Sequence, residues 1–182
     1  MTSPPEFSRP VRLDMLSTQA RTVSVEADDA ERAALARRFD LVAIDLLSAA
    51  ADCVRDGDVI NVTGTLAADV VQSCVASGEP VPAHVAEQFR LRFVPTAALE
   101  VHAEEIELSE EDCDVIGYTG SAIDLGEVVA ETLALSLEPF PRSPDADAAL
   151  RSAGVLGEEE AGPFAVLKGL KEKLGKSSST EP

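Results

Sequence analysis

The sequence predicts an α+β fold in which an antiparallel sheet, either open or closed into a barrel, packs against two main helices. Apolar and polar residues alternate over several segments of the first half, and this period of two is typical of strands with one buried face. Other segments repeat their apolar residues every three or four positions, which is the period of a helix. The 182 residues are enough to bury a hydrophobic core beneath such a sheet.

Alternation identifies the expected strands. They span Phe7–Leu13, Thr22–Glu26, Leu41–Leu47, Val59–Val75 and Glu87–Val94, with shorter strands at Ala98–His102 and Asp114–Tyr118. In the third strand, Val42, Ile44 and Leu46 would share one face. The sequence Asp56-Gly57-Asp58 predicts a hairpin turn, since glycine tolerates a positive φ. Gly64 interrupts the longest strand and is typical of a bend or a bulge.

The strand Glu87–Val94 carries a clear two-sided pattern. Phe89, Leu91 and Phe93 would face the core, whereas Arg90 and Arg92 would face outward. Guanidinium groups bind phosphate well, so these two arginines are candidate contacts for a partner. Pairing with acidic residues of the same chain is an equally good explanation, and the sequence leaves both open.

Two helix starts carry the capping-box pattern, which is an N-cap acceptor followed three positions later by glutamate. Asp28 with Glu31 begins the first helix, and Asp124 with Glu127 begins the second. The first helix is expected over Ala30–Phe39, and the second begins with Leu125 and ends before Pro139 and Pro141. Asp124 also invites a catalytic interpretation, but the cap explains it, and its loss would then cost about 1 kcal/mol.

The chain divides into an α+β domain over residues 1–141, a flexible acidic linker over 142–161, and a short amphipathic basic helix with a frayed tail over 162–182. Pro163 suits the first turn of that last helix. Phe164 and Leu167 fall on its apolar side and Lys168 on its basic side, which is typical of a helix that docks on another surface.

Charge restricts the classes of partner. Fifteen Lys and Arg residues oppose thirty-three Asp and Glu residues, which gives a net charge of −18. That balance opposes binding that neutralises nucleic-acid phosphates and favours a basic partner. No apolar run is long enough to span a bilayer and the N-terminus shows no signal-peptide pattern, so we expect a cytoplasmic protein. Cys53, Cys74 and Cys113 are too dispersed for a disulfide framework or a closed zinc site.

Two histidines, His84 and His102, are the candidates for acid–base or metal chemistry. His102 stands among Glu100, Glu104 and Glu105, and this set could hold a divalent metal in a small hydrolase. A solvated acidic strand and loop with an exposed histidine explains the same residues more simply. Walker, dinucleotide-binding and zinc-protease motifs are missing, so we expect no catalysis, no cofactor and no metal.

Three ordered blocks of sequence carry a resemblance to a known family. The first is Val70-Val71-Gln72-Ser73-Cys74. The second is Ile123-Asp124-Leu125 followed by Val128, Glu131, Leu133, Leu135, Leu137 and Pro139-Phe140-Pro141, and the third is Gly162-Pro163-Phe164-Ala165-Val166-Leu167 with Leu170 and Lys171. In this order and at these distances the blocks resemble the YceD family, which is named for accumulation of the large ribosomal RNA subunit. The resemblance covers most of the chain from the predicted hairpin turn onward.

The resemblance implies a bacterial, cytoplasmic and non-enzymatic factor that supports the synthesis, processing or stability of 23S rRNA. Its partners would be an assembly intermediate of the large subunit, a ribosomal protein or a 23S rRNA precursor, with no membrane and no small-molecule substrate. The candidate contacts are Arg90, Arg92, Phe164, Leu167, Lys168 and Lys171, while Gln72, Cys74, Asp124, Leu125, Glu127 and Pro163 would have structural roles. An acidic holdase or adaptor for a basic protein unrelated to ribosomes is the alternative.

One position departs from the pattern of many relatives, which carry a C-x-x-C pair in the first block. Val71 occupies the first cysteine position, and residues 142–161 contain neither Cys nor His. A metal-binding role of such relatives is therefore not carried over to this chain.

Overall fold

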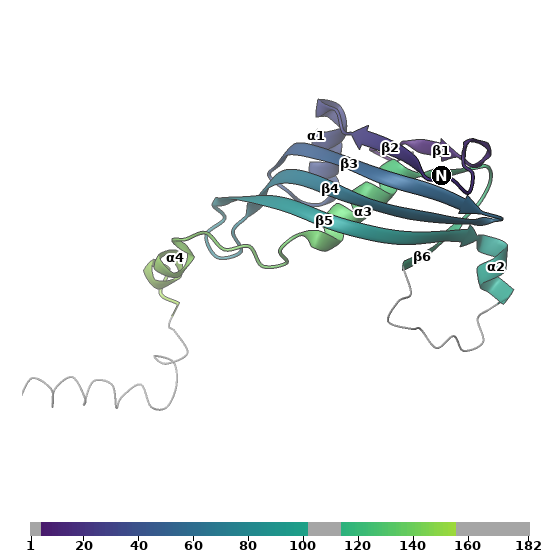
Figure 1. The fold of residues 1–182 in the computed structure, drawn as a ribbon. Coiled ribbons are helices and arrows are strands. Elements are labelled where there is room, and N and C mark those ends of the chain that lie inside the picture. Colours follow the sequence, from purple (N-terminus) through teal and green to yellow (C-terminus); the bar gives the residue numbers. More distant parts are fainter. Residues whose placement is uncertain (1–4, 102–113, 156–182) are drawn as a thin grey trace, which may run out of the picture.

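The computed structural model describes residues 5–101 and 114–155, and its strands form two sheets (Figure 1). The larger sheet has the order β2-β3-β4-β5-β6, and the smaller one pairs β1 with β7. The strands are β1 (Pro10–Arg12), β2 (Arg21–Glu26), β3 (Ala43–Asp56), β4 (Val59–Ser73), β5 (Pro80–Pro95), β6 (Asp114–Tyr118) and β7 (Ala122–Asp124). The α+β class is confirmed. The five-stranded sheet is open, with β2 and β6 at its edges, so closure into a barrel is wrong.

Helices connect and cover these strands. They are the 3-10 turn η1 (Leu13–Met15) and the α-helices α1 (Asp29–Arg38), α2 (Thr96–Val101), α3 (Leu125–Ser136) and α4 (Ala146–Ser152). The two main predicted helices correspond to α1 and α3, whereas β1 is shorter than the predicted strand Phe7–Leu13. The helix α4 falls within the predicted linker, and residues 156–182 lie outside the described ranges. No helix in the described part is long and apolar enough to cross a membrane.

The large sheet is mixed and not wholly antiparallel, because β6 runs parallel to β5. Parallel neighbours need a crossover connection, and α2 begins this connection directly after β5. The strand expected at Ala98–His102 is therefore wrong, since residues 96–101 form α2 and His102 lies outside the described residues. The segment contains Ala97-Ala98-Leu99-Glu100, and these good helix formers override its weak alternation.

A bulge in β3 changes which of its side chains face the core. The register between β3 and β4 shifts between Ile44 and Leu46. Ile44 and Leu47 are buried as a result, whereas Leu46 is only half-buried and Val42 is 58% exposed. The prediction that Val42, Ile44 and Leu46 share one face is therefore wrong.

Two glycines of the β3–β4 hairpin have different roles. Gly57 lies in the predicted turn with φ +62°, a conformation that suits glycine. Gly64 lies where the β3–β4 and β4–β5 ladders continue in register, so it marks no bulge. A Cβ at Gly64 would lie 2.6 Å from the Phe89 ring and 2.7 Å from the Ala50 carbonyl oxygen. Gly64 therefore permits close packing and not a bend.

The core lies between one face of the five-stranded sheet and the helices α1 and α3 (Figure 1). The sheet contributes the predicted inward residues Ile60, Val62, Leu66, Ala68, Val70, Phe89, Leu91 and Phe93. The helices contribute Leu35 from α1 and Leu125, Val129 and Leu133 from α3. The opposite face of the sheet exposes Arg90 and Arg92, so the prediction for both faces of β5 is confirmed over this stretch.

Candidate functional site

At the end of β4, two buried side chains join this strand to the segment that follows α3. The inward positions of β4 alternate, and the alternation continues through Gln72 and Cys74. The side-chain amide of Gln72 donates a hydrogen bond to the Glu138 carbonyl oxygen at 2.9 Å. The N–H of Ser143 donates to the sulfur of Cys74 at 3.2 Å. We call these four residues, together with Pro141, the Cys74 junction.

The sulfur of Cys74 lies among hydrogen-bond donors. The N–H of Ser143 has the largest effect, followed by the Ser77 side chain and by the N–H groups of Ala76 and Ser77. These donors stabilise the thiolate and lower the pKa of Cys74 to about 6. In contrast, burial raises the pKa of the Cys53 thiol. Only 3% of Cys74 is exposed, so its thiol is an anchor within the fold and not an accessible nucleophile.

Exposed apolar side chains flank the Cys74 junction. Val42, Val75 and Phe140 are 58%, 57% and 71% exposed. The Val75 N–H donates to the carbonyl of Pro141, and the Val42 N–H donates to that of Val71, so the backbone holds both valines at this end of the sheet. Large apolar residues that remain exposed in one place are typical of an interaction surface. Of these three, only Phe140 belongs to one of the three sequence blocks that resemble the YceD family.

Arg90 and Arg92 project from β5 on the exposed face of the sheet. Their neighbours across the ladder, Thr63 and Asn61 of β4, are exposed too. Neither guanidinium forms an ion pair with any residue in the described ranges, so both charges are available to a partner. The acidic residues at 102–113, which could pair with them, lie outside the described residues.

Asp124 holds the start of α3 against the N-terminal segment. Its side chain accepts the N–H groups of Gly126 and Glu127 at 3.0 and 3.3 Å, which confirms the predicted N-cap. It also accepts the N–H of Arg9 at 2.7 Å and the hydroxyl of Ser8 at 2.5 Å. These two donors are 115 and 116 residues away, and no local pattern predicted them. We call this group of residues the Asp124 junction.

Glu127 departs from the predicted capping box. Its carboxylate pairs with Arg38 of α1 at 2.7 Å. At α1 both arms of the box form, because the Asp28 side chain accepts the Glu31 N–H and the Glu31 side chain accepts the Asp28 N–H. The neighbouring Leu125 is fully buried and anchors the first turn of α3 in the core. Asp124, Leu125 and Glu127 thus all have structural contacts.

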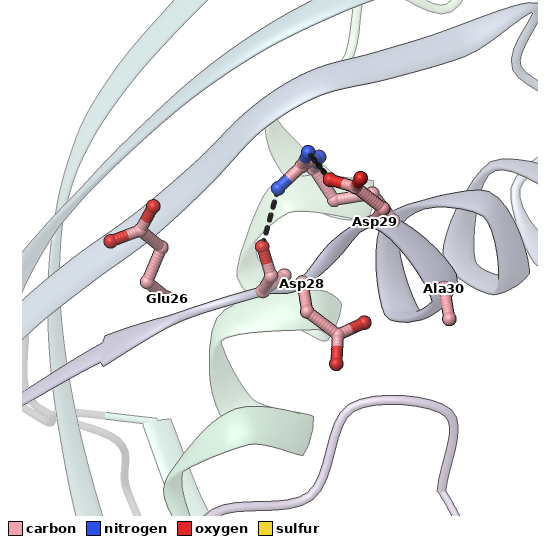
Figure 2. A pocket seen from close by; sticks show the side chains of 6 residues that line it. Glu26, Asp28, Asp29 and Ala30 are labelled. Atoms are coloured by element: carbon pink, nitrogen blue, oxygen red, sulfur yellow. Dashed lines mark hydrogen bonds and ion pairs between the residues drawn. The ribbon is translucent and has the colours of Figure 1, made fainter.

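The start of α1 borders a surface depression of about 710 Å³. Figure 2 shows Asp28 and Asp29 at the first turn of the helix, with Glu26 at the end of β2 pointing away from them. Arg32 pairs with Asp29 and also donates to the Ala27 carbonyl oxygen. These polar groups complete the helix start and fix its angle to β2.

The remaining candidates give little chemistry within the described ranges. His84 pairs with Asp69 on the exposed face of the sheet at 2.6 Å. No group of three or more His, Cys, Asp or Glu side chains in residues 5–101 and 114–155 is placed to hold a metal. Outside the described residues lie His102, Glu104, Glu105, Cys113, Pro163, Phe164, Leu167, Lys168 and Lys171, and the side chain of Glu100 is not described either.

Comparison with known proteins gives a family match that includes the Cys74 junction and, from the Asp124 junction, the residues at the start of α3. The family described as "Large ribosomal RNA subunit accumulation protein YceD" matches residues 62–171. That span contains Gln72, Cys74 and Asp124, together with the whole of α3. Searches of curated proteins and of solved structures return no match. Because the match covers more than half of the 182 residues, the chain belongs to the YceD family.

Proposed function

We propose that this protein is a non-enzymatic factor that promotes accumulation of the large ribosomal subunit by direct contact. Membership of the YceD family carries the proposal, because the family is described by accumulation of the large ribosomal RNA subunit. The contact would support the synthesis, processing or stability of 23S rRNA in the bacterial cytoplasm. The partner would be an assembly intermediate, reached through a ribosomal protein or through the 23S rRNA precursor.

Electrostatics supports two kinds of contact in this proposal. The net charge of −18 attracts a basic partner over long range and repels bare nucleic acid. Arg90 and Arg92 provide cations on the exposed face of the sheet, where a guanidinium can bind a phosphate oxygen. The protein would therefore approach a particle through its basic proteins and add a few short-range contacts to RNA.

The exposed apolar residues beside the Cys74 junction support a function that depends on contact with a partner and not on catalysis. Val42, Val75 and Phe140 offer area that a partner can cover, and removal of apolar surface from water drives most protein association. The neighbouring Cys74 is buried, so it shapes this surface without taking part in it.

Sedimentation in a sucrose gradient tests the proposal directly. The tagged full-length chain, produced in its own cells, should travel with immature particles of the large subunit, and loss of the gene should reduce mature 50S particles. A chain that remains at the top of the gradient, in cells with normal 50S particles, would overturn the proposal. If that chain is bound to one basic protein, the acidic holdase is the better description.

A charge-reversal pair tests the two arginines. Arg90→Glu combined with Arg92→Glu should reduce the particle-bound fraction about tenfold, because it replaces two attractive charges at the contact with repulsive ones. Arg37→Glu is the control, since Arg37 is exposed on α1 and has no ion pair within the described part of the chain. Equal sedimentation of the charge-reversal variant and the control would remove Arg90 and Arg92 from the contact.

Replacement of His102 separates the proposed factor from a metal-dependent hydrolase. His102→Ala should leave 50S accumulation unchanged, because contact needs no acid–base group. A variant that folds normally but loses its cellular role would favour the enzyme.

A further inference from the structure

A groove runs between α3, which lies beneath the large sheet in Figure 1, and the two neighbouring strands β5 and β6 of that sheet. Its volume is about 410 Å³. Phe89 and Leu91 of β5, Ile116 of β6 and Val128 of α3 form its apolar floor, and Leu135 of α3 stands at its rim. Leu135 is 85% exposed, so its side chain can contact a partner that enters the groove.

The strand β5 has a free edge beside this groove. On one side, β4 pairs with β5 from Pro80 to Phe93. On the other side, β6 pairs only with Leu91–Pro95, so residues 80–90 meet no strand there within the described chain. A free edge presents unpaired N–H and C=O groups in a row, which is a template for an added strand. Backbone pairing and apolar contact are therefore available at the same place.

The carboxylates around the groove define the charge of what can bind there. Asp114 and Glu131 line it, and Glu87 is exposed on the free part of β5. None of these three forms an ion pair with another described residue, whereas Arg90 is the one cation among the described lining residues. Acidic side chains on a free edge repel a second copy of an acidic chain and attract Lys or Arg.

We propose that the free edge of β5 binds an extended basic peptide segment of a partner protein as an added strand. Side chains that share one face of a strand lie two positions apart, so the segment would present apolar and basic residues in turn along its face toward α3. The apolar side chains would enter the groove, and the Lys or Arg side chains would lie near Glu87, Asp114 and Glu131. The inference deepens the proposed function, on which it rests, because it assigns the chemistry of the partner and the place where it docks.

The charge pattern favours this partner over two others. A nucleic-acid strand would bring phosphates toward three unpaired carboxylates, and it cannot continue a sheet ladder. A second copy of this chain would bring its own net charge of −18 to an acidic edge. Both alternatives remain measurable outcomes of the tests below.

The first test compares two synthetic peptides of about ten residues, enough to cover the free edge. One repeats Val-Thr-Lys-Thr, so that valine and lysine alternate along one face, and in the other glutamate replaces each lysine. The lysine peptide should bind the full chain at least about tenfold more tightly, and its affinity should fall as the Debye length shortens from about 30 Å at 0.01 M salt to about 8 Å at 0.15 M. Equal affinities, no binding of the lysine peptide, or tighter binding of a single-stranded RNA of similar length would overturn the inference.

The second test asks whether the peptide adds as a strand. Alternate N–H groups of a strand point to opposite edges, so only one set can reach β5 when the valines occupy the groove. N-methylation of the valines and lysines together, and of the threonines alone, should therefore give one peptide that binds and one that does not. Hydrogen exchange at residues 83–90 should slow when the unmethylated peptide binds. Equal effects of the two methylations, or unchanged exchange at these residues, would overturn strand addition.

Matched variants locate the site on the protein. Glu131→Lys should weaken binding of the lysine peptide about tenfold, and Leu135→Asn should weaken it similarly through lost apolar contact. Glu26→Lys is the control, because it makes the same change of charge on the edge strand β2, where Glu26 is exposed. A control that weakens binding as much as Glu131→Lys would show that net charge alone is responsible, which contradicts the assignment.

The results also separate this inference from the proposed function. If the lysine peptide fails to bind while the full chain still travels with immature large subunits, the docking site is wrong and the function stands. If the peptide binds but the chain does not associate with such particles and 50S accumulation is normal, the function is wrong and the docking site stands.

Discussion

The two ends of α3 are both tied to distant parts of the chain, but by different chemical groups. At its start, the Asp124 carboxylate accepts four donors, two from its own helix and two from Ser8 and Arg9. Beyond its end, Gln72 of β4 and Cys74, which directly follows β4, bind the backbone of Glu138 and Ser143. One junction relies on a carboxylate, and the other on an amide and on a thiol whose pKa is lowered to about 6.

The two junctions should differ in how much each contributes to the free energy of unfolding and in how that contribution depends on pH. Hydrogen bonds to a charged group are roughly twice as strong as those between neutral groups, so the Asp124 junction should contribute more to the free energy of unfolding. The Cys74 junction contains a thiol with a pKa of about 6, so its contribution should change near neutral pH. The attachment beyond the end of α3 is therefore the one whose contribution to stability should change with pH near neutrality.

Asp124→Ala should have the largest effect on stability. It leaves four donors without their acceptor and removes the side-chain bonds between the N-terminal segment and the start of α3, so the free energy of unfolding should fall by about 4 kcal/mol. Asp28→Ala is the matched control, since Asp28 caps α1 through a local bond only and should cost about 1 kcal/mol. Urea denaturation measures both. Similar losses for the two variants would show that Ser8 and Arg9 add nothing to the Asp124 junction.

Gly126→Ala should have the next largest effect. A Cβ at this position would lie 2.4 Å from the Phe7 carbonyl oxygen and 2.9 Å from the Arg9 nitrogen, so the N-terminal segment must move away from the helix. The expected loss is about 3 kcal/mol, the upper part of the range for overpacked sites. Gly78→Ala is the control. Gly78 has a positive φ and open space around it, so this variant introduces conformational strain without a steric overlap. An unchanged unfolding midpoint for Gly126→Ala would contradict the close approach.

Gln72→Ala should cost about 2 kcal/mol, because it removes a buried amide and leaves the Glu138 carbonyl without this donor. Gln88→Ala is the control, as Gln88 is exposed on β5, and it should change stability little. The measurement is again the midpoint of urea unfolding. A loss as large as that for Asp124→Ala would reverse the ranking of the two junctions.

Of these variants, Cys74→Ser should lower the free energy of unfolding least at acidic pH. The loss should grow as the pH rises. The folded-state pKa of Cys74 is about 6 and lies below the ordinary value of 9.0, so thiolate formation stabilises the native state as the pH increases from 6 to 9. This contribution is lost as the pH falls through 6. Serine does not ionise in this range, so the stability difference between the two proteins should widen with pH. A constant difference would mean that Cys74 remains a neutral thiol.

Local patterns predicted those parts of the fold that local interactions determine. The capping box of α1, the turn at Gly57 and the inward face of β4 all formed as expected. The bulge between Ile44 and Leu46 did not follow from the pattern, because alternation assumes a constant register. The helix α2 was missed because a segment of six residues offers too little sequence to separate a period of two from one near four.

The candidate surfaces were predicted only in part, for a related reason. Exposure of Arg90 and Arg92 follows from the alternation of β5, whereas the hydrogen-bond partners of Gln72 and Cys74 follow from no local pattern. The groove could not be predicted, since it depends on how far β6 extends along β5, and that pairing joins segments with no common local pattern. The same holds for the partner of Glu127, which belongs to another helix.

The bonds of Ser8 and Arg9 to Asp124 have a consequence for the order of events during translation. Synthesis proceeds at roughly 5–20 residues per second, so the beginning of the polypeptide waits on the order of ten seconds before its acceptor has even been made. During that interval Phe7, which is fully buried in the finished molecule, has none of the side chains of α3 to cover it. The first-made segment of the chain can therefore reach its final place only after the start of α3 has been synthesised.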